Sequence, residues 1–178
     1  RRKDVLYYYK RTQQTDPPPD RHRKEINMDA LQNILNRVSV RQFSDKPISD
    51  EDLHTILEAG MSGPTATNAR PWSFVVVRDP EMLNKMADAN VKYAEPLRRA
   101  TLGILVCGDL DRAIPFAPEF WVVDGSIAAQ NMILAANALG IGSCWLGTWP
   151  IEERVKNQPQ KIVSYPGGKP YWGLQHAV

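Results

Sequence analysis

The sequence has few cysteines and few histidines. Its 178 residues include two cysteines, Cys107 and Cys144, and three histidines, at positions 22, 54 and 176. Both cysteines lie in apolar runs, a pattern typical of buried, reduced thiols in a cytoplasmic protein. The histidines have no metal-ligand spacing with either cysteine, so we expect no metal site.

Long apolar runs are also missing. The chain has no stretch of about 18 apolar residues, so we expect no membrane-spanning helix and no membrane partner. The basic N-terminus is not followed by the apolar segment of a signal peptide. With 43% hydrophobic and 24% charged residues, the composition is that of one globular domain with a substantial core.

Positive charge is concentrated at the N-terminus. Residues 1–27 carry eight Lys or Arg and four Asp or Glu, whereas the other 151 residues carry 14 basic and 16 acidic side chains. The body therefore lacks the basic surplus of a nucleic-acid binder. The first 27 residues also contain three consecutive prolines, Pro17 to Pro19, which favour an extended linker. We interpret residues 1–27 as a tail that is disordered or was added by cloning, and residues 28–178 as the domain.

Hydrophobic periodicity predicts several helices and strands. A helix is expected from Asp29, a second from Ser49 with a capping box at Asp52, and a third from Pro80 to about Ala89. The runs 72–77, 101–108 and 143–149 and the segment 161–165 predict strands. Residues 151–157 predict a short helix. The alternation favours an α/β or α+β fold, with a mostly antiparallel sheet flanked by helices.

The longest predicted helix, residues 124–139, is apolar around most of its circumference. Gly140 follows at the position where a glycine commonly ends a helix. A helix with so little polar surface should be buried on most sides, and we expect it either at the centre of the domain or at a subunit interface.

Three polar segments are candidates for chemistry. "RVSVRQF" (37–43) places Arg37 and Arg41 on either side of Ser39; two guanidinium groups and a hydroxyl suit an anion such as phosphate, and they also suit an ordinary solvated surface. "GPTATNARPW" (63–72) is either a polar connection or a stiff loop that offers amide groups to a flat ligand. "ALGIGSCWLG" (138–147) has two glycines after a helix, which is the wrong context for a dinucleotide-binding turn.

The order and spacing of these segments resemble those of the nitroreductase family of flavoproteins. Members carry an Arg-x-Ser-x-Arg stretch, then a Pro-Ser/Thr-x-x-Asn-x-Gln-Pro-Trp loop, then an Ala-Ala-Gln-Asn helix that ends in Leu-Gly-Leu-Gly-Ser. The matching segments here are "RVSVRQF", "LEAGMSGPTATNARPWSFVVV" and "DGSIAAQNMILAANALGIGSCWLG". The resemblance covers residues 28 to 157.

The resemblance implies an intertwined homodimer that binds two FMN molecules at its interface. The first segment would hold the FMN phosphate and ribityl chain, the loop would come mostly from the partner chain, and the third would place backbone N–H groups near the flavin N5. A basic residue near the C-terminus would also contact the phosphate. The implied cofactor-binding residues are Arg37, Val38, Ser39, Arg41, Pro64, Thr65, Ala66, Asn68, Arg70, Leu146, Gly147 and Lys169.

Two departures from the family pattern stand out. Arg70 replaces the usual glutamine, and its guanidinium either approaches the flavin pyrimidine, where it would favour negative charge, or points into solvent. After Asn157 only three residues precede "KIVSYPGG", where the family usually has a longer stretch. The final "YWGLQHAV" has no clear place in the pattern.

The implied activity is an FMN-dependent transfer of hydride from NAD(P)H to a small acceptor such as a nitroaromatic or a quinone. No catalytic nucleophile or strong base is needed, because the cofactor carries the chemistry. Phe116, Phe120 and Trp121 are either a lid over the substrate or core aromatics. The alternatives are a flavin-binding sensor without turnover, a flavin-dependent dehalogenase or ring-fragmenting enzyme on the same scaffold, and an interaction module whose basic tail binds an acidic partner.

Overall fold

A five-stranded antiparallel sheet lies at the centre of the structure, a computed structural model that describes residues 7–9, 29–159 and 172–177. The strand order is β1-β2-β3-β5-β4, and every neighbouring pair is antiparallel. The strands are β1 (Tyr7–Tyr9), β2 (Trp72–Val77), β3 (Gly103–Gly108), β4 (Cys144–Leu146) and β5 (Trp172–Ala177).

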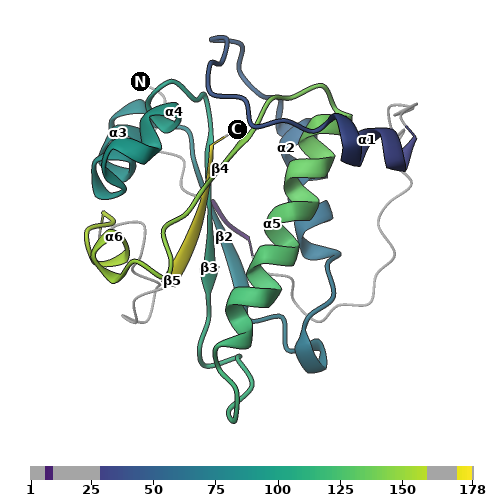
Figure 1. Cartoon of the computed structure of the whole chain (residues 1–178), viewed down its shortest axis with the longest axis vertical. Helices are drawn as coiled ribbons and strands as arrows, with labels where there is room; N and C mark the ends of the chain where they lie inside the picture. The colour runs from purple at the N-terminus through teal and green to yellow at the C-terminus, as the bar shows by residue number, and fades with distance from the viewer. Residues whose placement is uncertain (1–6, 10–28, 160–171, 178) are drawn as a thin grey trace.

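Helices cover both faces of this sheet (Figure 1). One layer holds α1 (Ala30–Asn36), α2 (Asp50–Met61) and α5 (Phe120–Ala138). The other layer holds α3 (Pro80–Ala89), α4 (Glu95–Arg98) and α6 (Glu152–Lys156), with a 3₁₀ turn at Val91–Ala94 between α3 and α4. The predicted antiparallel sheet flanked by helices is confirmed.

Strands β2 and β3 are buried on both faces of the sheet. Alternate side chains of a strand point to opposite sides of the sheet. Phe74, Val76 and Ile104 therefore join one core with α2 and α5, while Val75 and Leu105 join a second core with α3 and α4. All six residues of β2 and all six of β3 are buried, as expected for strands covered on both faces.

Two helices begin where the sequence predicted, one after the Ser49 cap and the other at Pro80. Ser49 precedes α2 and its hydroxyl accepts from the Asp52 backbone N–H at 3.0 Å. Asp79 precedes α3 and accepts from the Met82 N–H at 3.0 Å, with Pro80 in the first helical position. These bonds satisfy N–H groups that a helix start otherwise leaves without partners.

Helix α5 begins one turn earlier than the sequence predicted. It starts at Phe120 rather than Asp124, and the added turn contains the buried Trp121. Its end agrees with the prediction: Gly140 has φ +74°, and its N–H donates to Asn137 O while the Ile141 N–H donates to Ala136 O. This pair of bonds is a Schellman motif, which requires the left-handed backbone that glycine adopts readily.

Two strands were not anticipated. Strand β5, at Trp172–Ala177, lies between β3 and β4 in the sheet, although the sequence had offered no place for this segment. Strand β1, inside the N-terminal segment, pairs with β2 through Tyr8 and Val75. The strand expected at residues 161–165 falls outside the described residues.

Helix α1 has apolar side chains that the chain itself does not bury. Leu31, Ile34 and Leu35 are 69%, 52% and 80% exposed. The helix is held instead by polar contacts to α5: Asn33 Nδ2 donates to Leu134 O at 3.0 Å, and Asn137 Nδ2 donates to Asn33 Oδ1 at 2.7 Å. The sequence predicted this helix correctly, but its apolar positions face away from the domain core.

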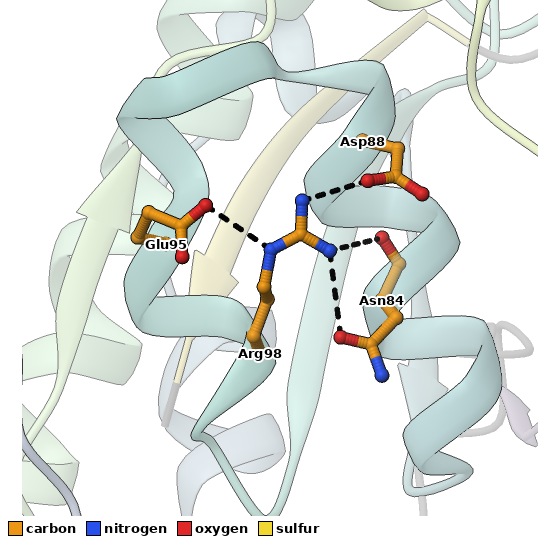
Figure 2. Close-up of polar contacts among 4 residues, drawn as sticks. All are labelled: Asn84, Asp88, Glu95 and Arg98. Atoms are coloured by element: carbon orange, nitrogen blue, oxygen red, sulfur yellow. Dashed lines mark hydrogen bonds and ion pairs between the residues drawn. The ribbon is translucent and has the colours of Figure 1, made fainter.

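Arg98 joins α4 to α3 through several polar contacts (Figure 2). Its Nη2 lies 2.7 Å from Asp88 Oδ1, its Nε lies 3.1 Å from Glu95 Oε1, and its Nη1 donates to Asn84 O at 3.4 Å. We expect Arg98→Ala to lower the free energy of unfolding by about 1 kcal/mol, because contacts to two partially exposed carboxylates are lost together. Chemical denaturation checks this value.

Lys85→Ala is the matched control for Arg98→Ala. Lys85 lies on α3, the helix that Arg98 contacts from α4, and it forms one exposed i,i+4 pair with Glu81. A single exposed pair contributes little, so this variant should lose less stability than Arg98→Ala. Equal losses in the two variants would contradict a special role for the Arg98 contacts.

Candidate functional site

The arginine segment lies beside the start of β4. Arg37 ends α1 in an extended conformation, with φ −63° and ψ 124°. Ser39 then forms a parallel bridge with Ser143, and the Val40 N–H donates to Ser143 O at 2.9 Å. Gly142 permits this approach, because a Cβ there would lie 3.0 Å from the Val40 methyl carbons. Two segments about 100 residues apart in sequence are thus adjacent in space.

Neither arginine of this segment is neutralised by a described carboxylate. Arg37 is half-buried, Ser39 and Arg41 are exposed, and no ion pair among the described residues includes either guanidinium. Arg41 Nη1 donates to Ser39 O at 3.3 Å. Its charge also reaches Cys144, where burial raises the pKa of the thiol and Arg41 opposes that rise. The segment can therefore receive an anion.

The polar loop after α2 has a strained backbone. Thr67, Asn68 and Arg70 have φ values of 52°, 59° and 49°, a region that residues other than glycine adopt rarely and at some cost. Internal bonds stabilise the shape: the Arg70 N–H donates to Thr65 Oγ1 at 3.0 Å, and Arg70 Nε donates to Asn68 Oδ1 at 2.9 Å. In the single chain Arg70 therefore folds back onto its own loop.

A buried carboxylate contacts this loop. Asp124 on α5 is 2% exposed, and its Oδ1 accepts from the Ala66 N–H at 3.0 Å. Burial raises the pKa of Asp124, and the bond from Ala66 opposes the rise. Asp124 was not among the predicted site residues, although an acidic residue that opens a nearly apolar helical run is a usable signal.

The segment after β4 combines close packing with a further arginine contact. Leu146 is buried, and a Cβ on Gly147 would lie 3.1 Å from the Trp145 ring. The Gly147 carbonyl accepts from Arg154 Nη1 at 2.9 Å, and the Arg154 guanidinium lies 5.1 Å from the centre of the Tyr93 ring. Neither Arg154 nor Tyr93 carried a recognisable signal in the sequence.

A single chain does not bring all the predicted site residues together. Residues 37–41 lie with residues 142–147 beyond the C-terminal end of α5, whereas the loop 64–70 contacts the N-terminal part of α5 (Figure 1). From Asp124 to Ala138 this helix rises about 20 Å. Lys169 falls outside the described residues.

The structure distinguishes the three aromatic residues that the sequence suggested as a lid or as core residues. Trp121 is 4% exposed and lies 5.9 Å from Trp149, ring centre to ring centre. It is a core residue. Phe116 is 86% exposed and Phe120 is 46% exposed, so these two stay available to a ligand or a partner.

Comparison with known proteins identifies the family. The sequence model of the nitroreductase family matches residues 34–101 and 88–160, well over half of the chain. The chain belongs to the nitroreductase family. A protein from Archaeoglobus fulgidus, provisionally named an NADH dehydrogenase/NAD(P)H nitroreductase, is 47% identical over 128 residues, which are 72% of this chain and 72% of that protein.

Solved structures of nitroreductases have the same fold. A crystal structure of a protein of the same provisional name from Bacteroides thetaiotaomicron has a TM-score of 0.72 and 38% identity, and covers 83% of this chain and 84% of that one. A provisionally named nitroreductase from Desulfovibrio desulfuricans, in complex with FMN, has a TM-score of 0.67 and 31% identity, with 83% of each chain covered. This member of the nitroreductase family is thus an oxidoreductase.

Two further findings concern the described part of this family member. Among its helices, α5 included, none combines the length and the apolar character needed to cross a bilayer. Within residues 7–9, 29–159 and 172–177, no group of three or more His, Cys, Asp or Glu side chains is placed to hold a metal ion. Cys107 and Cys144 are both free and buried, as expected from their apolar surroundings.

Proposed function

We propose that this nitroreductase is a homodimeric, FMN-dependent NAD(P)H oxidoreductase that reduces a small acceptor such as a nitroaromatic or a quinone. The observation that carries the proposal is the pair Arg37 and Arg41, placed beside β4 without a carboxylate partner in the described chain. The FMN complex of a relative and the NAD(P)H in another relative's name support the choice of cofactor and co-substrate.

The donor set of the arginine segment fits the phosphate end of FMN. Two guanidinium groups can each give two N–H bonds to phosphate oxygens, and the exposed Ser39 hydroxyl adds a third donor group. Val38 belongs to the same extended stretch. Lys169 is proposed as a further phosphate contact on the strength of the sequence alone.

The opposite end of the site would come from Leu146, Gly147 and the loop of a second chain. Gly147 has no side chain at a point where a Cβ would lie 3.1 Å from the Trp145 ring, so its backbone is not covered by a side chain of its own. Pro64, Thr65, Ala66, Asn68 and Arg70 form a loop that its own hydrogen bonds hold in one shape. Because the loop and the arginine segment lie at opposite ends of α5 in one chain, the partner subunit's copy of the loop is the one we place beside the arginines.

A second copy of the chain would also explain the exposed apolar side chains of α1. Leu31, Ile34, Leu35 and Val38 are all more than half exposed in the single chain, and a contiguous exposed apolar patch commonly marks a protein interface. This region adjoins the arginine segment, so the same contact would complete the FMN site. Size-exclusion chromatography with light scattering measures the oligomeric state directly.

Bound FMN would supply the hydride chemistry, accepting from NAD(P)H and delivering to the acceptor. The protein would bind the phosphate, hold the ring between the two chains and limit the entry of water. Fixed N–H groups and cations near the ring would favour negative charge on it. The free, buried thiols support a reducing compartment such as the cytoplasm.

The absorption spectrum of the purified protein tests this function. We expect visible flavin bands, bleaching on anaerobic addition of NADH or NADPH, and recovery on addition of a nitroaromatic or quinone. Steady-state NAD(P)H oxidation that depends on the acceptor would then separate an enzyme from a flavin-binding sensor without turnover. A colourless, monomeric protein that does not bind added FMN would contradict the proposal.

A further inference from the structure

The position of the Asp124 carboxylate is unfavourable for the stability of the fold, which points to a role other than packing. The side chain is 2% exposed. Its Oδ1 accepts one backbone hydrogen bond, and its Oδ2 is buried without a partner among the described residues. Burying a carboxylate with one oxygen unpaired is destabilising, so a helix packed only for stability would gain from an apolar residue here.

The single bond that Asp124 accepts is the only described hydrogen bond between residues 64–70 and another part of the chain. The other bonds of this loop are internal, such as those from the Asn68 N–H to Thr65 O and from the Ala69 N–H to Ala66 O. Internal bonds set the shape of the loop, but they do not determine where it lies relative to α5. The bond from the Ala66 N–H to Asp124 is the described hydrogen bond that joins the loop to α5.

The backbone conformation of the loop requires contacts that hold it in place. Three of its residues have positive φ without being glycine, and a conformation of this kind persists only when surrounding contacts hold it. Ala66 begins the 3₁₀ turn that contains two of them, Thr67 and Asn68. Releasing the Ala66 N–H would therefore free the turn at its first residue.

We propose that Asp124 is a positioning residue: by accepting the Ala66 N–H, it holds the loop 64–70 in the conformation that contacts the flavin of the partner subunit. This rests on the proposed function, because it takes the loop to line the FMN site. Asp124 would not touch the cofactor itself. It would act by keeping Ala66 and Asn68 in place before FMN binds, which lowers the cost of ordering the loop on binding.

The test compares Asp124→Ala with Asp124→Asn. The alanine variant removes the acceptor, and we expect it to weaken FMN binding by about tenfold and to reduce turnover of bound FMN with a quinone acceptor. The asparagine variant keeps an oxygen at the Oδ1 position, so FMN affinity should stay within about threefold of wild type. Titration of FMN fluorescence gives the affinities.

Amide hydrogen exchange provides a readout that does not depend on FMN. The Ala66 amide should exchange faster in Asp124→Ala than in wild type, and close to the wild-type rate in Asp124→Asn. Asp124→Ser, whose hydroxyl is too short to replace the carboxylate oxygen, should behave like the alanine variant and serves in its place if Asp124→Ala fails to fold.

Asn131→Ala is the matched control. Asn131 lies two turns further along α5, and its Nδ2 donates to Ala59 O at 3.2 Å, at the end of α2 rather than in the loop. We expect some loss of stability but an unchanged FMN affinity.

The possible results lead to different conclusions. Faster Ala66 exchange, with weaker FMN binding that asparagine restores, supports the positioning role. Wild-type FMN affinity in Asp124→Ala and Asp124→Ser overturns it, as does an equal loss of affinity in Asn131→Ala, which would show a general effect of stability. Wild-type protein that does not bind FMN refutes the proposed function instead, and the exchange rates would then still show whether Asp124 anchors the loop.

Discussion

Replacing Arg37 with alanine is expected to weaken FMN binding by about 1.5–3 kcal/mol, a loss of roughly ten- to 150-fold in affinity. Arg41→Ala should have an effect of similar size. The reason is electrostatic and geometric: each guanidinium can donate two hydrogen bonds to phosphate oxygens, and no described carboxylate competes for either side chain. Fluorescence titration of the FMN-free protein measures the change.

Two further variants make this result specific. Arg37→Lys keeps the positive charge but loses the planar pair of donors, so its affinity should lie between those of wild type and Arg37→Ala. Arg99→Ala removes an exposed arginine next to α4, in the helix layer on the other face of the sheet, and should leave FMN binding unchanged. An arginine variant with wild-type affinity would exclude that residue from the phosphate site.

Gly108→Ala is expected to lower the free energy of unfolding by about 3 kcal/mol, the upper end of what overpacking usually costs. A Cβ on Gly108 would lie 2.4 Å from Trp121 Cδ2 and 2.5 Å from Cε3. Trp121 cannot move away easily, because it is buried and packs against Trp149. Gly108 is equally confined, since its strand is hydrogen-bonded on both sides to β2 and β5.

Denaturant unfolding at a constant protein and FMN concentration tests the Gly108 prediction. Gly140→Ala is the control: nothing lies within 4 Å of a Cβ there, but φ is +74°, so we expect a smaller loss, about 1 kcal/mol, from backbone strain alone. In a Trp121→Ala background the effect of Gly108→Ala should shrink, because the clashing ring is absent. A full effect in that background would contradict the steric explanation.

Local sequence patterns were sufficient to predict much of the fold. The starts of α2 and α3 depend on Ser49 and Asp79, which bond to N–H groups three residues away. The end of α5 depends on Gly140 and its immediate neighbours. Strands β2 and β3 are marked by apolar runs that Ser73 alone interrupts. In each case the determining interaction or pattern lies within a few residues, so it is visible in the sequence.

Long-range contacts explain the structural features that the sequence did not predict. The first turn of α5 forms before Asp124, where Trp121 packs against β3 at Gly108. Strand β5 lies between β3 and β4 and has no apolar run of its own to mark it. The bonds from Ala66 to Asp124 and from Arg154 to Gly147 link residues that no local spacing relates.

The sequence by itself determined the family, the positions of most helices and strands, and the residue types that suit a phosphate-bearing cofactor. Only the tertiary structure decided which of those residues are neighbours. It places the arginine segment beside β4 and the strained loop at the far end of α5. The physical reason is that residue type and spacing set local conformation, whereas the distance between remote segments depends on how the whole sheet and its helices pack.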